Sequence, residues 1–230
     1  MIRDSIVPLL VCASAISLGL IAVSGSASAG EMEISKLVGS IEVEPGDHVG
    51  DLSTINGSIH IRSDATAGRA KTVNGGVHLE PGASAKEIDV TNGGIHLQGA
   101  RVSGRVHTVN GGVHLEHGAE VSGDVANVNG GIQVVEAHIL GSIHAANGDI
   151  DLGPNSRVDG DVTIEPDHSS HSSNYCPPRV VIEPGTVVSG RLRFERQVRL
   201  YVSDQATIGE VEGAQPVRFS GNRPPAEDCR

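Results

Sequence analysis

The sequence predicts an all-β fold, a single-stranded parallel β-helix (β-solenoid) whose coils of about 18 residues stack along one axis. Three observations predict it: an Asn-Gly pair at nearly constant spacing, aliphatic columns at fixed offsets from that pair, and repeats too short to hold a helix. The Asn residues of these pairs are Asn56, Asn74, Asn92, Asn110, Asn129 and Asn147, separated by 18, 18, 18, 19 and 18 residues. A period this short indicates one supersecondary unit stacked on copies of itself.

The aliphatic columns predict which residues point into each coil. Three and five residues after the Asn lies a Val, Ile or Leu, as in Val77 and Leu79, and the residue between them is polar. This alternation is typical of a strand with one buried face. Val102, Val121 and Val158 each lead into a turn of the form Val-Ser-Gly or Val-Asp-Gly. We therefore expect about three short strands and three turns per coil, with parallel pairing at about 4.8 Å between coils. The uneven spacing favours a right-handed winding over the left-handed form that regular six-residue rungs can take.

The pattern divides the chain into three parts. Residues 1–29 are predicted to be a signal peptide, because Arg3 precedes an apolar stretch that ends in Ala27-Ser28-Ala29. Residues 30–202 are predicted to form the solenoid, a rod of about eight to nine coils and about 40 Å, with an inserted loop at 167–179. Residues 203–230 are expected to form a C-terminal cap and tail.

The signal peptide predicts export, to the periplasm or to the cell surface. An uncleaved membrane anchor and lipidation at Cys12 are the alternatives. After cleavage, no segment of the sequence is apolar and long enough to cross a bilayer.

Charge and composition exclude several classes of function. The formal net charge is −11, and the sequence lacks a stripe of Lys and Arg, so nucleic-acid binding is not expected. Aromatic residues make up only 2% of the chain, so aliphatic residues must fill the core. Nothing resembles a nucleophile elbow or an oriented catalytic base, and the Gly-Gly-x-Gly-x-Asp pattern of calcium-binding β-rolls is missing. The sequence thus predicts a protein that is not an enzyme.

The Asn column is predicted to be structural. Asn-Gly suits the positive φ angles of tight turns, and stacked Asn side chains can hydrogen-bond from coil to coil.

A column of His residues is the most suggestive candidate site. Four residues after the Asn, the chain places His60, His78, His96 and His114, which should form an exposed ladder at about 4.8 Å spacing. Imidazole is a common ligand of Zn²⁺ and Cu²⁺, and Glu80 and Glu116 could add carboxylates. Two alternatives remain: surface residues copied by duplication without a role, and a strip that responds to pH. Apart from such a metal, no cofactor is expected.

Cysteine content predicts one disulfide. Cys176 and Cys229 remain after signal cleavage, and in an oxidising compartment they would form a bond. The alternative is two free thiols.

Repeats such as Val73-Asn74-Gly75-Gly76-Val77-His78-Leu79 resemble the adhesin-like β-solenoid family of bacterial envelope proteins. The segments 118–125 (GAEVSGDV) and 184–192 (PGTVVSGRL) are similar to bactofilins, which are polymer-forming β-helix proteins. Together these resemblances cover about residues 36–202. Bactofilins generally act inside the cell, whereas this chain begins with an export signal. The resemblances imply a structural or adhesive envelope protein that contacts envelope proteins or polysaccharide. Filament formation by end-to-end pairing is the alternative.

Overall fold

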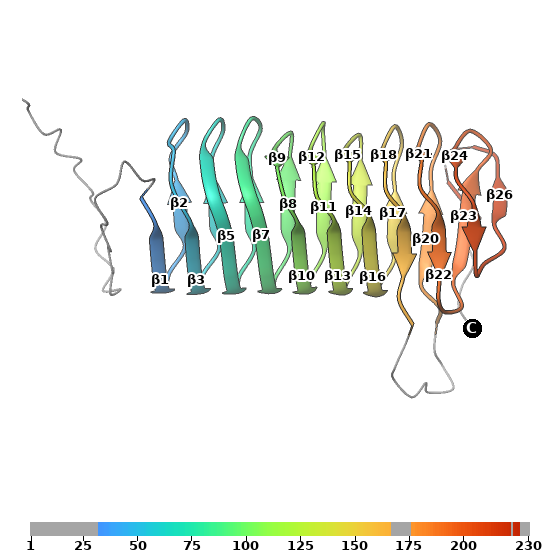
Figure 1. Ribbon diagram of the computed structural model, residues 1–230, viewed down its shortest axis with the longest axis horizontal. Helices are drawn as coiled ribbons and strands as arrows, with labels where there is room; N and C mark the ends of the chain where they lie inside the picture. The colour runs from blue at the N-terminus through green and yellow to red at the C-terminus, as the bar shows by residue number, and fades with distance from the viewer. Residues whose placement is uncertain (1–31, 167–175, 222, 226–230) are drawn as a thin grey trace, which may run out of the picture.

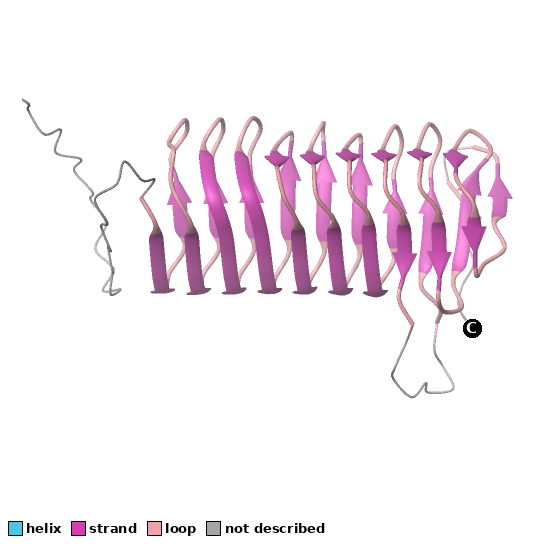
Figure 2. Cartoon of the chain, in the orientation of Figure 1, coloured by secondary structure: helices cyan, strands magenta, loops and turns pink. Residues whose placement is uncertain are grey.

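The computed structural model describes residues 32–166, 176–221 and 223–225. Its described part contains 26 strands and no helix. Figure 2 shows the strands along the whole rod. The predicted all-β fold class is therefore confirmed. The predicted signal peptide and residues 167–175 of the predicted inserted loop lie outside the described residues. Among those described, no helix has the length and apolar character needed to span a membrane.

A ten-stranded parallel sheet supplies one strand to every coil, and Figure 1 shows these coils side by side along the long axis. Its strands are β2 (Ile41–Val43), β4 (Ile59–Ile61), β6 (Val77–Leu79), β8 (Ile95–Gln98), β11 (Val113–Glu116), β14 (Ile132–Val135), β17 (Ile150–Leu152), β20 (Arg179–Ile182), β23 (Arg199–Ser203) and β26 (Val217–Phe219).

A sixteen-stranded parallel sheet forms the rest of the wall and divides into two branches. It begins with β1 (Ile34–Val38), β3 (Leu52–Asn56), β5 (Thr66–Asn74) and β7 (Ser84–Asn92). One branch continues through β9 (Arg101–Val102), β12 (Glu120–Val121), β15 (His138–Ile139), β18 (Arg157–Val158), β21 (Val187–Val188) and β24 (Thr207–Ile208). The other continues through β10 (Val106–Asn110), β13 (Val125–Asn129), β16 (Ile143–Asn147), β19 (Val162–Ile164), β22 (Leu192–Phe194) and β25 (Val211–Glu212).

The division follows from one extra residue in the chain. In β7, two residues separate the buried Ala85 and Ile88, whereas in the next coil three residues separate the buried Val102 and Val106. In that coil Ser103, Gly104 and Arg105 lie outside any strand, so the position of one long strand is shared by the two short strands β9 and β10. Coils after β8 therefore have the three strands that the sequence predicts, whereas β5 and β7 each run straight through this position.

The stack is longer than the eight to nine coils expected. The last strands, β24, β25 and β26, pair in parallel with β21, β22 and β23, so the sheets continue beyond residue 202. Residues 207–219 belong to the solenoid, where the sequence suggested a cap. The repeat pattern of the sequence does not indicate this coil, because it carries neither the Asn-Gly pair nor the full set of aliphatic columns.

One apolar cluster runs through the interior from the first coil to the last. The residue three positions after each Asn is at most 1% exposed in Ile59, Val77, Ile95, Val113 and Ile132. Burying each such side chain stabilises the fold by about 1.5–3 kcal/mol. Because every coil covers the next, no single coil holds a core of its own.

The glycine that directly follows each Asn allows the coils to approach closely. Gly75 has φ of 150°, and a Cβ at this position would lie 2.0 Å from the carbonyl oxygen of Gly57 in the preceding coil. Any larger residue would push the two coils apart, which explains why glycine recurs here.

Candidate functional site

The Asn side chains form a continuous hydrogen-bonded ladder on the outside of the rod. In each pair the Nδ2 donates to the Oδ1 of the preceding Asn, at 2.9–3.2 Å. The members of this Asn ladder are Asn56, Asn74, Asn92, Asn110, Asn129 and Asn147, and all are exposed. Every side-chain amide points the same way along the axis, so the ladder fixes the register between coils.

The four predicted His residues lie on adjacent strands in direct register. His60, His78, His96 and His114 come from β4, β6, β8 and β11, and each is the Cα partner of the next. Their rings stack in parallel, with centroids 4.9, 4.9 and 4.6 Å apart and interplanar angles of 6°, 8° and 5°. We call this set the His ladder. It lies on the outer face of the ten-stranded sheet because the residues on either side of each His point inward.

One edge of the His ladder faces a row of glycines. A Cβ at Gly76 would lie 3.2 Å from His78 Nε2, and one at Gly112 would lie 3.0 Å from His114 Nε2. The same construction at Gly94 gives 3.5 Å to His96 Nε2. Since glycine has no side chain, the Nε2 edges of these three rings face backbone only on that side.

The C-terminal end of the His ladder is fixed by an amide. His114 Nδ1 lies 3.0 Å from Gln133 Oε1, an oxygen that can only accept a hydrogen bond. A hydrogen bond between these two atoms requires the proton on Nδ1, and Nε2 of a neutral His114 then keeps its lone pair.

The two predicted carboxylate neighbours differ in their contacts. Glu80 accepts hydrogen bonds from the Ser63 backbone N–H and hydroxyl at 3.1 Å each, and from Arg62 at 3.1 Å. These bonds, with the Ser63 hydroxyl as the main cause, hold the pKa of Glu80 below its ordinary value. Glu116 instead acts on the ladder, because its charge favours the protonated form of His96. Glu80 is thus occupied by a neighbouring turn, and Glu116 is the carboxylate coupled to the rings.

The central rings favour the neutral state. Burial lowers the pKa of His78, and the neighbouring His96 and His60 lower it further. Burial and His114 likewise lower the pKa of His96, against the opposing charge of Glu116. Both shifts have the same origin: the charged ring loses water and meets like charge at short range.

In this arrangement the rings do not converge on one point. Within the described ranges, no group of three or more His, Cys, Asp or Glu side chains is arranged to hold a metal ion. The lone pairs of parallel rings point in parallel directions, so two rings must tilt to share one ion. Zn²⁺ or Cu²⁺ binding by the His ladder therefore stays a prediction.

A buried Thr column was missed by the sequence analysis. Thr54, Thr72 and Thr108 point inward two residues before the Asn, and each is at most 1% exposed. Thr72 and Thr108 donate to the carbonyl of the glycine after the Asn of the preceding coil, at 2.9 and 3.0 Å. Thr54 donates at 3.1 Å to the equivalent Gly39, which follows Val38. The signal was available in the sequence, because this position shares the inward parity of the aliphatic residue four before the Asn.

Charged side chains alternate along the outer face of the sixteen-stranded sheet. Arg69 and Arg105 both contact Glu87 at 3.0 Å, and Arg105 also reaches Asp89 at 3.3 Å. Such exposed pairs stabilise little individually, but their alternation discourages a slip of one coil against the next.

The outer face of the ten-stranded sheet changes character towards the C-terminus. After Gln133 the His column continues as Asp151, Val181 and Tyr201, and the last two are 2% exposed. Burial raises the pKa of Asp151, which Arg179 opposes, and burial followed by the charge of Asp151 raises the pKa of Glu183. Partial burial disfavours the charged form of both carboxylates, and within the described residues no group of metal ligands includes them.

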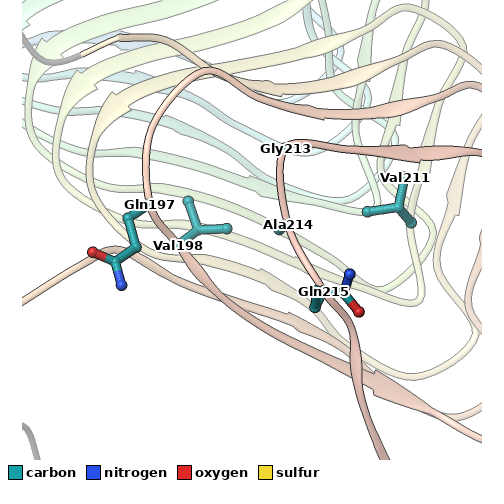
Figure 3. A pocket seen from close by; sticks show the side chains of 6 residues that line it. All are labelled: Gln197, Val198, Val211, Gly213, Ala214 and Gln215. Atoms are coloured by element: carbon teal, nitrogen blue, oxygen red, sulfur yellow. The ribbon is translucent and has the colours of Figure 1, made fainter.

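A shallow hollow lies at the C-terminal end of the rod (Figure 3). Its lining is Gln197, Val198, Val211, Gly213, Ala214 and Gln215. Val198, Val211 and Ala214 pack against the end of the apolar core, so the hollow is the place where the last coil closes. Its lining residues carry no ionisable group, which gives it no evident catalytic chemistry.

Of the predicted disulfide, only Cys176 belongs to the described residues. Cys229 lies outside them, and the bond stays a prediction.

No protein family model matches the chain, and neither a curated protein nor a solved structure matches it. The resemblances to adhesin-like solenoids and bactofilins accordingly remain interpretations of short motifs.

Proposed function

We propose that the protein is an exported structural protein of the bacterial cell envelope, adhesin-like and non-catalytic, which presents a rigid repetitive surface to envelope proteins or polysaccharide. The observation that carries this proposal is the unbroken register of the coils. Equivalent residues from Leu52 to Val125 pair directly, coil after coil, and the Asn ladder repeats the same order outside. A surface with one chemical motif every coil suits contact with an extended, repetitive partner.

The polar groups of the rod support a structural role. The Asn side chains bond to one another, the Arg and Glu residues of β5, β7 and their neighbours form ion pairs, and the buried Thr hydroxyls bond to backbone carbonyls. These groups are used within the stack, and Arg105 and Asp89, which also line a hollow of about 310 Å³, are paired with each other. Catalysis usually requires several groups to meet at one point in a concave site.

Export is supported by the basic, apolar and small-residue pattern of residues 1–29. Fractionation of cells that produce an epitope-tagged copy tests this part. We expect the tag in the periplasm or on the surface, with the protein shortened after Ala29. A cytoplasmic protein of full length would contradict it.

Binding to the envelope is tested separately. The purified protein is mixed with isolated cell walls and outer envelope polysaccharide and then sedimented. A cell wall or polysaccharide that binds the protein should carry the wild-type protein into the pellet. A variant with altered surface columns should be pelleted less. Recovery of all protein in the supernatant would contradict the adhesive role.

End-to-end assembly is a second candidate, favoured by the apolar first coil. Met32, Leu37 and Val38 are 57%, 57% and 66% exposed, and Val217 at the other end is 48% exposed. Open sheet edges with apolar side chains favour pairing between chains. Electron microscopy of the purified protein distinguishes the cases: filaments support this candidate, and short separate rods exclude it.

A further inference from the structure

We propose that the His ladder binds a divalent transition metal ion, Cu²⁺ or Zn²⁺, between the imidazole rings of His96 and His114. This inference adds a chemical property to one face of the rod and does not depend on the envelope role. Imidazole nitrogen suits Cu²⁺ and Zn²⁺, whereas Mg²⁺ and Ca²⁺ prefer sets of oxygen ligands to imidazole.

The spacing of the two strands brings the rings within reach of one ion. His96 and His114 are direct Cα partners on β8 and β11, and their centroids are 4.6 Å apart, the shortest separation in the ladder. Metal–nitrogen bonds of about 2.1 Å at a tetrahedral angle need nitrogens about 3.4 Å apart. Because the lone pairs lie in the planes of two parallel rings, the rings must rotate about their Cα–Cβ and Cβ–Cγ bonds until both Nε2 atoms aim at one ion.

The hydrogen bond from His114 to Gln133 prepares the ligand atom. In metal sites, a ligating His commonly donates its other N–H to a carbonyl or carboxylate, which fixes the ring and its tautomer. Here Nδ1 lies 3.0 Å from Gln133 Oε1, so Nε2 is the nitrogen with the free lone pair. The spacing of the His residues alone does not indicate this contact, because Gln133 stands where the His column is interrupted.

The pair lies on a solvent-facing side of the rod, because His96 is exposed and His114 is half-buried. The nearest residues below it are Gly94 and Gly112, which place no side chain against the rings. An ion that approaches from solvent therefore meets no side chain on the glycine side of the rings.

The local charge favours a cation. Glu116 is electrostatically coupled to His96, and the whole chain carries a formal charge of −11. Negative charge raises the local concentration of cations and so assists binding. His60 and His78 repeat the stacking at 4.9 Å, without the contact to Gln133 that His114 makes.

Titration of the purified protein with Cu²⁺, followed by calorimetry and electron paramagnetic resonance, tests the proposal. We expect one tightly bound ion per chain with nitrogen ligands. The variant His96→Gln/His114→Gln, which uses the residue naturally present at position 133, should lose affinity by about tenfold or more. The matched control His107→Ala/His144→Ala changes a column that naturally contains Ala126 and should keep the wild-type affinity. Equal affinity in the ladder variant, or equal loss in the control, would overturn the proposal.

A second measurement needs no variant and so does not depend on variant folding. The ring ¹⁵N resonances of the folded wild-type protein are followed while Zn²⁺ is added. Shifts of the Nε2 signals of His96 and His114, ahead of those of His107 and His144, support the site. Shifts confined to rings outside the His ladder contradict it.

Discussion

Arg196 donates a hydrogen bond to the side-chain oxygen of Asn147 at 2.9 Å, although it lies two coils further along the rod. The same guanidinium nitrogen donates to the carbonyl of Ala146 at 3.0 Å. Asn147 is the last member of the Asn ladder, and its Oδ1 is the acceptor end of a row of aligned amides. A cation at this end completes the ladder, as basic residues do at the C-terminus of a helix.

Replacement of Arg196 should loosen the C-terminal coils. Arg196→Met keeps much of the apolar stem but removes both donors, so we expect a loss of about 1 kcal/mol and faster amide hydrogen exchange around Asn147. Arg193→Met removes an exposed charge from the neighbouring strand position and should change stability by less than half as much. Equal effects of the two substitutions would show that Arg196 acts only as a surface charge.

The buried Thr column should contribute measurably to stability. Thr72→Val keeps the shape but leaves the Gly57 carbonyl without its 2.9 Å donor, so we expect a loss of about 1 kcal/mol, or about 2–4 °C in Tm. The control is Thr91→Val, a half-exposed position where other coils already have Val73 and Val109. Thermal unfolding should distinguish them, and a Thr72→Val variant as stable as the control would contradict the assigned hydrogen bond.

Acid should destabilise the metal-free protein through the His ladder. The folded-state pKa values of His78 and His96 lie below the ordinary value of 6.5, so folding favours their neutral forms. The stability that these two neutral rings contribute is fully present above pH 6.5. It is lost as the pH falls through their lower folded-state pKa values. Denaturant unfolding in the presence of a chelator should show lower stability at pH 5 than at pH 7. In His78→Gln/His96→Gln this loss should be smaller, and an unchanged loss would place its origin elsewhere.

Neutralisation of Asp151 should stabilise the rod at pH 7. Burial raises the pKa of this carboxyl, and its Oδ1 is buried without a hydrogen-bond partner. The folded state thus favours the protonated form, and this contribution is present at low pH and lost as the pH rises through the folded-state pKa. Asp151→Asn should raise Tm by about 1–2 °C at pH 7. The gain should disappear near pH 3, and a lower Tm at pH 7 would mean that the attraction to Arg179 dominates.

The sequence predicts the stack because its two signals are local and repeated. The Asn spacing gives the coil length, and the alternation around residues such as Val77 and Leu79 gives the buried face. The final coil is not predictable in this way, because Arg196 and Gln215 stand where earlier coils have Asn. The final coil belongs to the solenoid because its strands pair with β22 and β23. The sequence of one coil does not reveal this pairing.

The candidate site is predictable in position but not in detail. Equal offsets place His60 to His114 in one column at the expected spacing. The parallel orientation of the rings depends on rotamers and on the glycines beside them. The hydrogen bonds from Ser63 to Glu80 depend on a turn in the preceding coil. Only the three-dimensional structure therefore shows that Glu80 contacts this turn and not the His ladder.

Contacts between equivalent residues of successive coils test the central claim most directly. Nuclear Overhauser spectra of the methyl-labelled protein should show Val77 beside Ile95, Ile95 beside Val113, and Val113 beside Ile132, as the parallel register requires. The account predicts these contacts at separations of 18, 18 and 19 residues. Contacts at other offsets, or the reversed order of an antiparallel sheet, would contradict it.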